Sequence, residues 1–70
     1  MNEVIFEVAE DVSDGGFVAK ALGVSIVTQA ETLEELRENV RDAVRCHFDS
    51  ETDRPKVIRL HFVQDEVLAV

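Results

Sequence analysis

Few side chains in this sequence have the type and spacing that catalysis needs. The two histidines, His47 and His61, lie on different predicted elements, and no nucleophile stands at a recognisable spacing from either. The single cysteine, Cys46, lies near the end of a predicted helix, where the helix dipole does not favour a reactive thiolate. We therefore interpret Cys46 as a packing residue, and we expect a protein that is not an enzyme.

An enzymatic alternative depends on two acids and a histidine from separate strands. Glu3, Glu7 and His61 are oxygen and nitrogen donors that could support metal-dependent, nuclease-like chemistry if the strands bring them together. The strand pattern supplies no obvious acid cluster, and the glycine pair at 15–16 precedes a strand instead of the helix that a phosphate-binding loop requires. We expect no metal site and no cofactor, and the nuclease stays the less favoured alternative.

The composition is that of one small acidic globular domain. The chain has 70 residues, of which 46% are hydrophobic and 31% charged, and its net charge is −8. A domain of this size buries only about 60% of the surface exposed in its unfolded form, so packing against another copy or a partner matters for its stability. The negative charge opposes the binding of phosphate groups and favours a basic protein as partner. We expect no direct binding of nucleic acid.

The same sequence predicts a cytoplasmic protein. One cysteine leaves no internal disulfide, which fits a reducing compartment. The first residues, MNEVIFEV, have neither the basic region nor the apolar run of a signal peptide. No segment reaches the roughly 20 apolar residues that a membrane span needs, so we expect no membrane contact.

Hydrophobic periodicity divides the chain into strands and one helix. Alternation over residues 3–9 places Val4, Phe6 and Val8 on one face of a half-buried strand. A capping box formed by Thr32 and Glu35 marks the start of the helix. We predict strands over 3–9, 16–22, 24–30 and 56–63, a helix over 33–48, and, for residues 64–70, either a strand extension or a short extra strand.

The predicted helix has an apolar stripe and a regular charged face. Each of three acids precedes an arginine by three residues, a spacing that predicts ion pairs worth about 0.2–0.5 kcal/mol each. Such a pattern is most often a solvated helix face, and a binding surface is the alternative. If a partner uses this face, the acids that carry the binding are Glu34, Glu38 and Asp42.

The order β-β-β-α-β predicts an α+β domain with one mostly antiparallel sheet and one helix on one face. Pairing of the last strand parallel to the first places the third, second, first and last strands in that order across the sheet. The uncovered face then mixes aliphatic and charged side chains, which is typical of an interface. We predict that the protein forms a homo-oligomer, and the interface residues that we expect are Ile5, Val57, Arg59, His61 and Val63.

Two adjacent stretches, GGFVAKALG and VTQAETLEELRENVRDAV, resemble the HicB-like antitoxin family, in particular its small stand-alone members of the UPF0150 type. The first stretch has a glycine before an aromatic residue in a hairpin, and the second has a TQ-x-x-T-x-E-E segment that opens the helix. The ending RLHFVQDEVLAV is similar to that of the stand-alone members. The residues that carry the resemblance are Gly15, Gly16, Phe17, Thr28, Gln29, Thr32, Leu33, Glu34 and Glu35.

The resemblance implies a fold, a partner and a mechanism. The fold is the partial ribonuclease-H-like one, as a single HicB-like domain over residues 1–70 without a C-terminal DNA-binding domain. The partner is a HicA-type toxin, a small basic ribonuclease that cleaves mRNA, and its catalytic histidine is covered in the complex. We expect a HicB-like antitoxin that is a dimer or a tetramer. An orphan oligomeric structural or binding module is the alternative.

Overall fold

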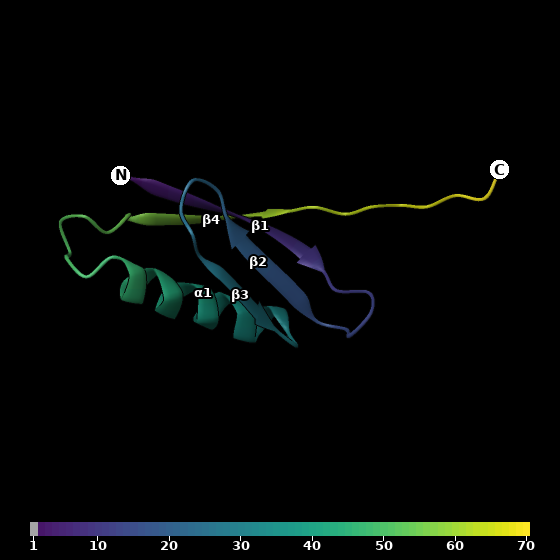
Figure 1. Cartoon of the computed structure of the whole chain (residues 1–70), viewed down its shortest axis with the longest axis horizontal. Helices are drawn as coiled ribbons and strands as arrows, with labels where there is room; N and C mark the ends of the chain where they lie inside the picture. The colour runs from purple at the N-terminus through teal and green to yellow at the C-terminus, as the bar shows by residue number, and fades with distance from the viewer. Residues whose placement is uncertain (1) are drawn as a thin grey trace.

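A computed structural model describes residues 2–70 as a four-stranded sheet and one α-helix (Figure 1). The class is α+β, as predicted, and the element order is β-β-β-α-β. The elements are β1 (Glu3–Glu10), β2 (Phe17–Ala21), β3 (Val27–Ala30), α1 (Leu33–His47) and β4 (Val57–Phe62).

The sheet has the strand order β3-β2-β1-β4. β1 pairs antiparallel with β2 and parallel with β4, and β2 pairs antiparallel with β3. The predicted order and the predicted parallel pair are both confirmed. β3 and β4 are therefore the two edge strands, and β1, the first strand of the chain, lies in the interior of the sheet.

The core lies between α1 and the sheet face that β1 fills with Val4, Phe6 and Val8. Phe6 and Val8 pair in register with Ala21 and Ala19 of β2, whose small side chains leave room for the helix. Burial of each large side chain stabilises the fold by about 1.5–3 kcal/mol. The buried apolar residues are Val4, Phe6, Val8, Ala19, Ala21, Ile26, Leu36, Val40 and Val44, which confirms the alternation of the first strand and the stripe of the helix.

Polar groups satisfy both ends of α1. At the start, the Thr32 hydroxyl accepts a hydrogen bond from the Glu35 backbone N–H at 3.1 Å. The return bond of the predicted capping box, from the Thr32 N–H to the Glu35 carboxylate, is not formed between these described residues. At the end, the Arg54 guanidinium donates to the Phe48 carbonyl oxygen at 3.1 and 3.3 Å, so a cation faces the negative end of the helix dipole.

One glycine is required where β2 begins beside the end of β3. Gly16 has a φ of +85°, and a Cβ at this position would lie 2.6 Å from the Ala30 carbonyl oxygen. The Gly16 carbonyl also accepts a hydrogen bond from the Asp11 N–H at 2.9 Å, which closes the β1–β2 connection. The close approach of β3 depends on this position having no side chain.

Two predicted strands differ from the structure. The third strand begins at Val27 and not at residue 24, because the chain turns tightly before it: the Ala21 N–H donates to the Ile26 carbonyl, and the Ile26 N–H donates to the Val24 carbonyl. The prediction of strand structure for residues 64–70 is wrong. This segment leaves the end of β4 and runs away from the domain without a neighbouring strand (Figure 1).

No helix in the part of the chain that the structure describes, residues 2–70, is long and apolar enough to cross a membrane.

Candidate functional site

The residues of the enzymatic alternative lie on the sheet face that α1 leaves open. Glu7 of β1 and His61 of β4 are register partners, and Glu3 lies four residues before Glu7 on the same face, beyond Ile5. Glu3 is already bound, because Arg59 donates from Nε and Nη2 to its two carboxylate oxygens at 3.0 and 2.9 Å. Among residues 2–70 there is no group of three or more His, Cys, Asp or Glu side chains that could hold a metal ion.

The Glu3–Arg59 ion pair changes the titration of both groups. The hydrogen bonds from Arg59 lower the pKa of the Glu3 carboxyl from its ordinary value of 4.5, desolvation opposes this shift, and the attraction between the charges adds to it. The same hydrogen bonds and charge raise the pKa of Arg59. Arg59 is therefore held on the open sheet face with its charge balanced.

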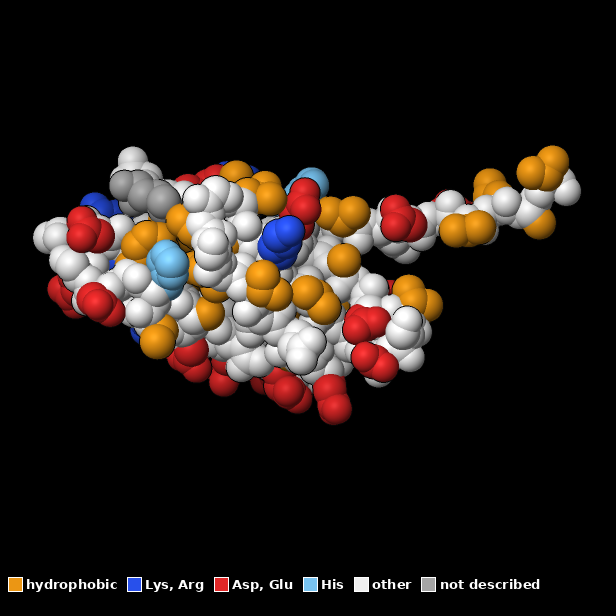
Figure 2. Space-filling view, viewed as in Figure 1, with side chains coloured by type: hydrophobic (Ala, Val, Ile, Leu, Met, Phe, Trp, Pro, Cys, Tyr) orange, Lys and Arg blue, Asp and Glu red, His pale blue; other side chains and the backbone are white. Residues whose placement is uncertain are grey.

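The predicted oligomer interface is brought together on that open face. Ile5 pairs in register with Arg59, Glu3 with Val57, and Glu7 with His61. Val63 follows β4 on the same side, and its N–H donates to the Val8 carbonyl at 2.8 Å. Figure 2 shows aliphatic side chains around a few charged ones on the face of the molecule turned to the viewer. The five predicted interface residues, Ile5, Val57, Arg59, His61 and Val63, are thus neighbours on β1 and β4.

The predicted partner-binding acids form one row on the solvent side of α1. Glu34, Glu38 and Asp42 are all exposed and follow each other at intervals of four residues, which places them one above the other on a helix. The acidic surface continues toward the β1–β2 turn, as Figure 2 shows along that edge of the molecule. Near the start of the helix, a shallow hollow is lined by Glu35, Glu31, Asp11 and Asp14. We call the row of three acids together with the acids of this hollow the acidic side.

The arginines of α1 form a row next to these acids, and Arg41 and Arg45 share a hollow with Glu38 and Asp42. Arg37 and Arg41 border a shallow groove that runs between α1 and β4. Arg45 and Lys56 border its continuation toward the start of β4. We call this feature the basic groove; its apolar floor is formed by Val40, Val44, Ile58 and Leu60, and five of the seven basic residues of the chain line it, namely Arg37, Arg41, Arg45, Arg54 and Lys56.

Sequence reasoning missed the basic groove because it assigned each arginine to an acid three residues before it. Only the last of these pairs forms between described residues, with Arg45 Nη1 3.4 Å from the Asp42 carboxylate. The prediction of pairs at Glu34–Arg37 and Glu38–Arg41 is wrong. The signal that could have revealed the groove is the spacing of the arginines themselves, which recur every four residues and therefore share one side of the helix.

The remaining candidates for chemistry lie at two places, the end of α1 and the open face of the sheet. Cys46 is exposed, so its interpretation as a packing residue is wrong. The His47 ring lies edge-on to the Phe48 ring at the end of α1, with 4.9 Å between the ring centroids. His61 lies on β4, on the open face of the sheet.

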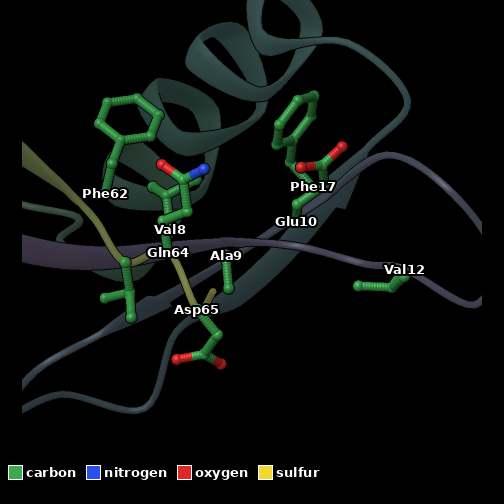
Figure 3. A pocket seen from close by; sticks show the side chains of 9 residues that line it. Val8, Ala9, Glu10, Val12, Phe17, Phe62, Gln64 and Asp65 are labelled. Carbon is green, nitrogen blue, oxygen red and sulfur yellow. The ribbon is translucent and has the colours of Figure 1, made fainter. Parts of the chain in front are cut away.

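A hollow of about 330 Å³ opens where β4 leaves β1. Phe17 and Phe62 stand on the helix side of this hollow, and Asp65 points to the opposite side of the strand (Figure 3). Its walls are aliphatic and aromatic with two carboxylates, Glu10 and Asp65, so it holds neither a base paired with a nucleophile nor a cationic group for a phosphate.

Two relatives decide the family of the chain. The sequence is 44% identical over 68 residues to a UPF0150 protein of Thermotoga maritima, a match that covers 97% of this chain and 93% of the relative. It is 59% identical over 54 residues to a UPF0150 protein of Archaeoglobus fulgidus, a match that covers 77% of each chain. The chain belongs to the UPF0150 family. No family model and no solved structure matches the sequence.

Membership of the UPF0150 family confirms one part of the expected resemblance. The names of the two UPF0150 relatives state no activity, ligand or partner. Three surfaces of this UPF0150 chain are candidates for binding a partner: the acidic side, the basic groove and the open sheet face.

Proposed function

We propose that this UPF0150 protein is a HicB-like antitoxin, which binds a small basic mRNA-cleaving toxin of the HicA type and covers its active site. The observation that carries the proposal is the acidic side, where Glu34, Glu38 and Asp42 are exposed on a rigid helix. A ribonuclease needs cationic groups to hold RNA phosphates, and an acidic surface of complementary shape competes for those groups.

The geometry of α1 suits inhibition without chemistry. A helix of 15 residues spans about 22 Å, which is long enough to lie across the active site of a small domain. Glu34 and Glu38 make no ion pair with a described residue, so both are free to bind a cationic partner. The net charge of −8 adds long-range attraction, which accelerates the encounter with a basic protein. Inhibition is then steric and electrostatic.

The test is inhibition of a purified HicA-type toxin, encoded in the same genome, that is cleaving a labelled RNA. Wild-type protein is expected to stop cleavage at roughly equimolar amounts. A variant with Glu34→Lys, Glu38→Lys and Asp42→Lys is expected to lose affinity at least about tenfold, which corresponds to about 1.4 kcal/mol. An active toxin that the wild-type protein neither binds nor inhibits would overturn the proposed function.

The matched control changes net charge by the same amount at another place. Asp49, Glu51 and Asp53 are exposed in the loop between α1 and β4, so the variant with all three changed to lysine tests charge without touching the helix. We expect this loop variant to inhibit within about threefold of the wild type, because distant exposed charges are largely screened. An equal loss in both variants would remove the acidic side from the interface.

The open sheet face favours a second candidate, an oligomeric structural or binding module without a toxin partner. Val57 and Val63 are exposed on the same face as Ile5, which gives a surface of aliphatic and charged side chains of the kind that interfaces use. A tight oligomer that has no effect on toxin activity would support this candidate against the antitoxin.

A further inference from the structure

We propose that residues 63–70 form an arm that pairs, antiparallel, with the free edge of β4 in a second copy of the chain. Each copy gives its arm to the other, so the two edge strands join around a two-fold axis. The apolar side chains of the arm then lie in the basic groove of the second copy. Three features of the described residues carry this proposal: a bare strand edge, an uncovered groove and an arm whose last apolar residues are exposed.

The bare edge belongs to β4. This strand ends the sheet order and pairs only with β1 among the strands of residues 2–70. The backbone N–H and C=O groups on its outer side therefore lack strand partners. Such an edge is a template for pairing with another chain, which natural proteins either block or use.

The uncovered groove lies on the helix side of the same strand. α1 lies nearest to β3 and β2, and the helix-side residues of β4 are less buried than those of β1. Ile58 and Leu60 are only half-buried, and Phe62 is 52% exposed. Their register partners on β1 are Val4, Phe6 and Val8, all fully buried. An apolar segment laid along the outer edge of β4 would complete the cover.

The arm carries large apolar side chains that its own domain leaves in solvent. Val67 and Leu68 are 93% and 76% exposed, and the segment runs straight away from the sheet (Figure 1). Residues 63–70 continue the direction of β4 and do not turn back onto its outer edge (Figure 1). A second copy is therefore the nearest surface that fits the arm.

The alternation of β4 determines which arm residues enter the groove. Phe62 and Gln64 point to the helix side and Asp65 to the other side (Figure 3), and the same alternation places Leu68 and Val70 on the helix side. With Gln64 on the two-fold axis, Leu68 lies opposite Leu60 of the second copy and Val70 lies opposite its Ile58. Both apolar residues of the groove edge are then covered.

The acidic arm and the basic groove have opposite charges, which favours the arm over a neutral segment as the occupant of the groove. In the same register Glu66 lies opposite Phe62 of the second copy. α1 runs opposite to β4, so Arg37, near the start of the helix, borders this end of the groove (Figure 1). Arg37 makes no ion pair with a described residue of its own chain. The dimer therefore pairs Glu66 of each arm with Arg37 of the second copy, in a protein that otherwise repels itself.

Sedimentation equilibrium tests the pairing. We expect the wild-type protein to be a dimer, and Leu68→Asp, Glu66→Arg and Arg37→Glu each to weaken dimerisation at least about tenfold. The double variant Glu66→Arg/Arg37→Glu is expected to recover most of the loss, because the charges are exchanged. Residues 66 and 68 are exposed, so these changes leave the domain folded, and circular dichroism checks that they do.

The control is Val27→Asp, an equally drastic change on the other edge strand, β3, where Val27 is exposed. It is expected to leave the dimer intact. A monomeric wild-type protein, a dimer insensitive to Leu68→Asp, or a failure of the exchanged charges to recover dimerisation would each overturn the proposal. Binding of labelled RNA in the groove by the wild-type monomer would identify a different occupant and overturn it as well.

Disulfide cross-linking tests the two-fold axis. Cys46 is first changed to serine, because it is exposed and would react. Gln64→Cys in this background is expected to cross-link two chains under mild oxidation, and Glu51→Cys, in the loop before β4, is not. A dimer in which only Glu51→Cys cross-links would contradict the arrangement. These experiments use the arm and the basic groove, so their outcome is independent of the acidic side and of toxin inhibition.

Discussion

At the scale of single residues, two adjacent glycines differ in why a side chain is unfavourable at each position. Gly16 has a positive φ and no space for a Cβ, because the Ala30 carbonyl lies against it. Gly15 also has a positive φ, +76°, but nothing lies within 4 Å of the place where its Cβ would be. A substitution at Gly15 therefore tests the backbone conformation alone, and a substitution at Gly16 tests the conformation together with the steric contact.

We expect Gly16→Ala to destabilise the domain by about 3 kcal/mol and Gly15→Ala by about 1 kcal/mol. Both variants force a side chain into a left-handed conformation, and only the first also pushes β3 away from β2. Urea unfolding of the two variants measures the difference. Equal losses would show that the contact with the Ala30 carbonyl relaxes without cost.

Glu3 and Arg59 give a prediction about pH. The folded-state pKa of Glu3 lies below its ordinary value of 4.5, so the ion pair adds stability above that value and loses it as the pH falls through the lower folded pKa. The destabilisation caused by Glu3→Gln is therefore expected at pH 7 and should fade in acid. NMR titration of Glu3 should also give a higher pKa in Arg59→Gln, and an unchanged value would contradict the role of Arg59.

At the scale of elements, the start of α1 has one of the two hydrogen bonds that make a capping box. The Thr32 hydroxyl accepts from the Glu35 N–H, whereas the Glu35 carboxylate gives no return bond to the Thr32 N–H. We expect Thr32→Ala to cost about 1 kcal/mol of unfolding free energy and Glu35→Gln close to zero. Thermal or urea unfolding compares the two, and a larger loss for Glu35→Gln would contradict this division.

The elements that sequence predicted well are those whose pattern repeats. Val4, Phe6 and Val8 alternate over a whole strand, and the helix stripe recurs over four turns, so burial of one face determines both. The start of β3 was predicted three residues too early. The hydrogen bond from the Ala21 N–H to the Ile26 carbonyl closes a turn that ends just before Val27, and the sequence pattern does not reveal this bond. The arm was wrongly predicted as a strand because its apolar residues resemble those of a strand. The sequence pattern alone does not reveal whether a neighbouring strand is present to pair with it.

The candidate site was only half predictable for a related reason. The row of Glu34, Glu38 and Asp42 follows from helix geometry alone and was found. The basic groove requires knowing which side of α1 faces β4. Local pairing energies of about 0.2–0.5 kcal/mol are too small to hold Arg37 and Arg41 to their acidic neighbours.

At the scale of the whole molecule, charge is divided between two adjacent rows on one helix. The acidic side joins the helix to the β1–β2 turn, and the basic groove separates the helix from β4. A basic protein and an acidic arm therefore fit adjacent surfaces of the same small domain.

The parallel pairing of β1 with β4 also has a consequence for biosynthesis. Residues 3–8 are synthesised well before their partners, residues 57–62. Pairing between segments so distant in sequence slows folding, because the loop that it closes contains β2, β3 and α1. A nascent chain ending before β4 would present β1 as a bare apolar edge, so prematurely terminated copies would aggregate before any domain exists to bind a partner.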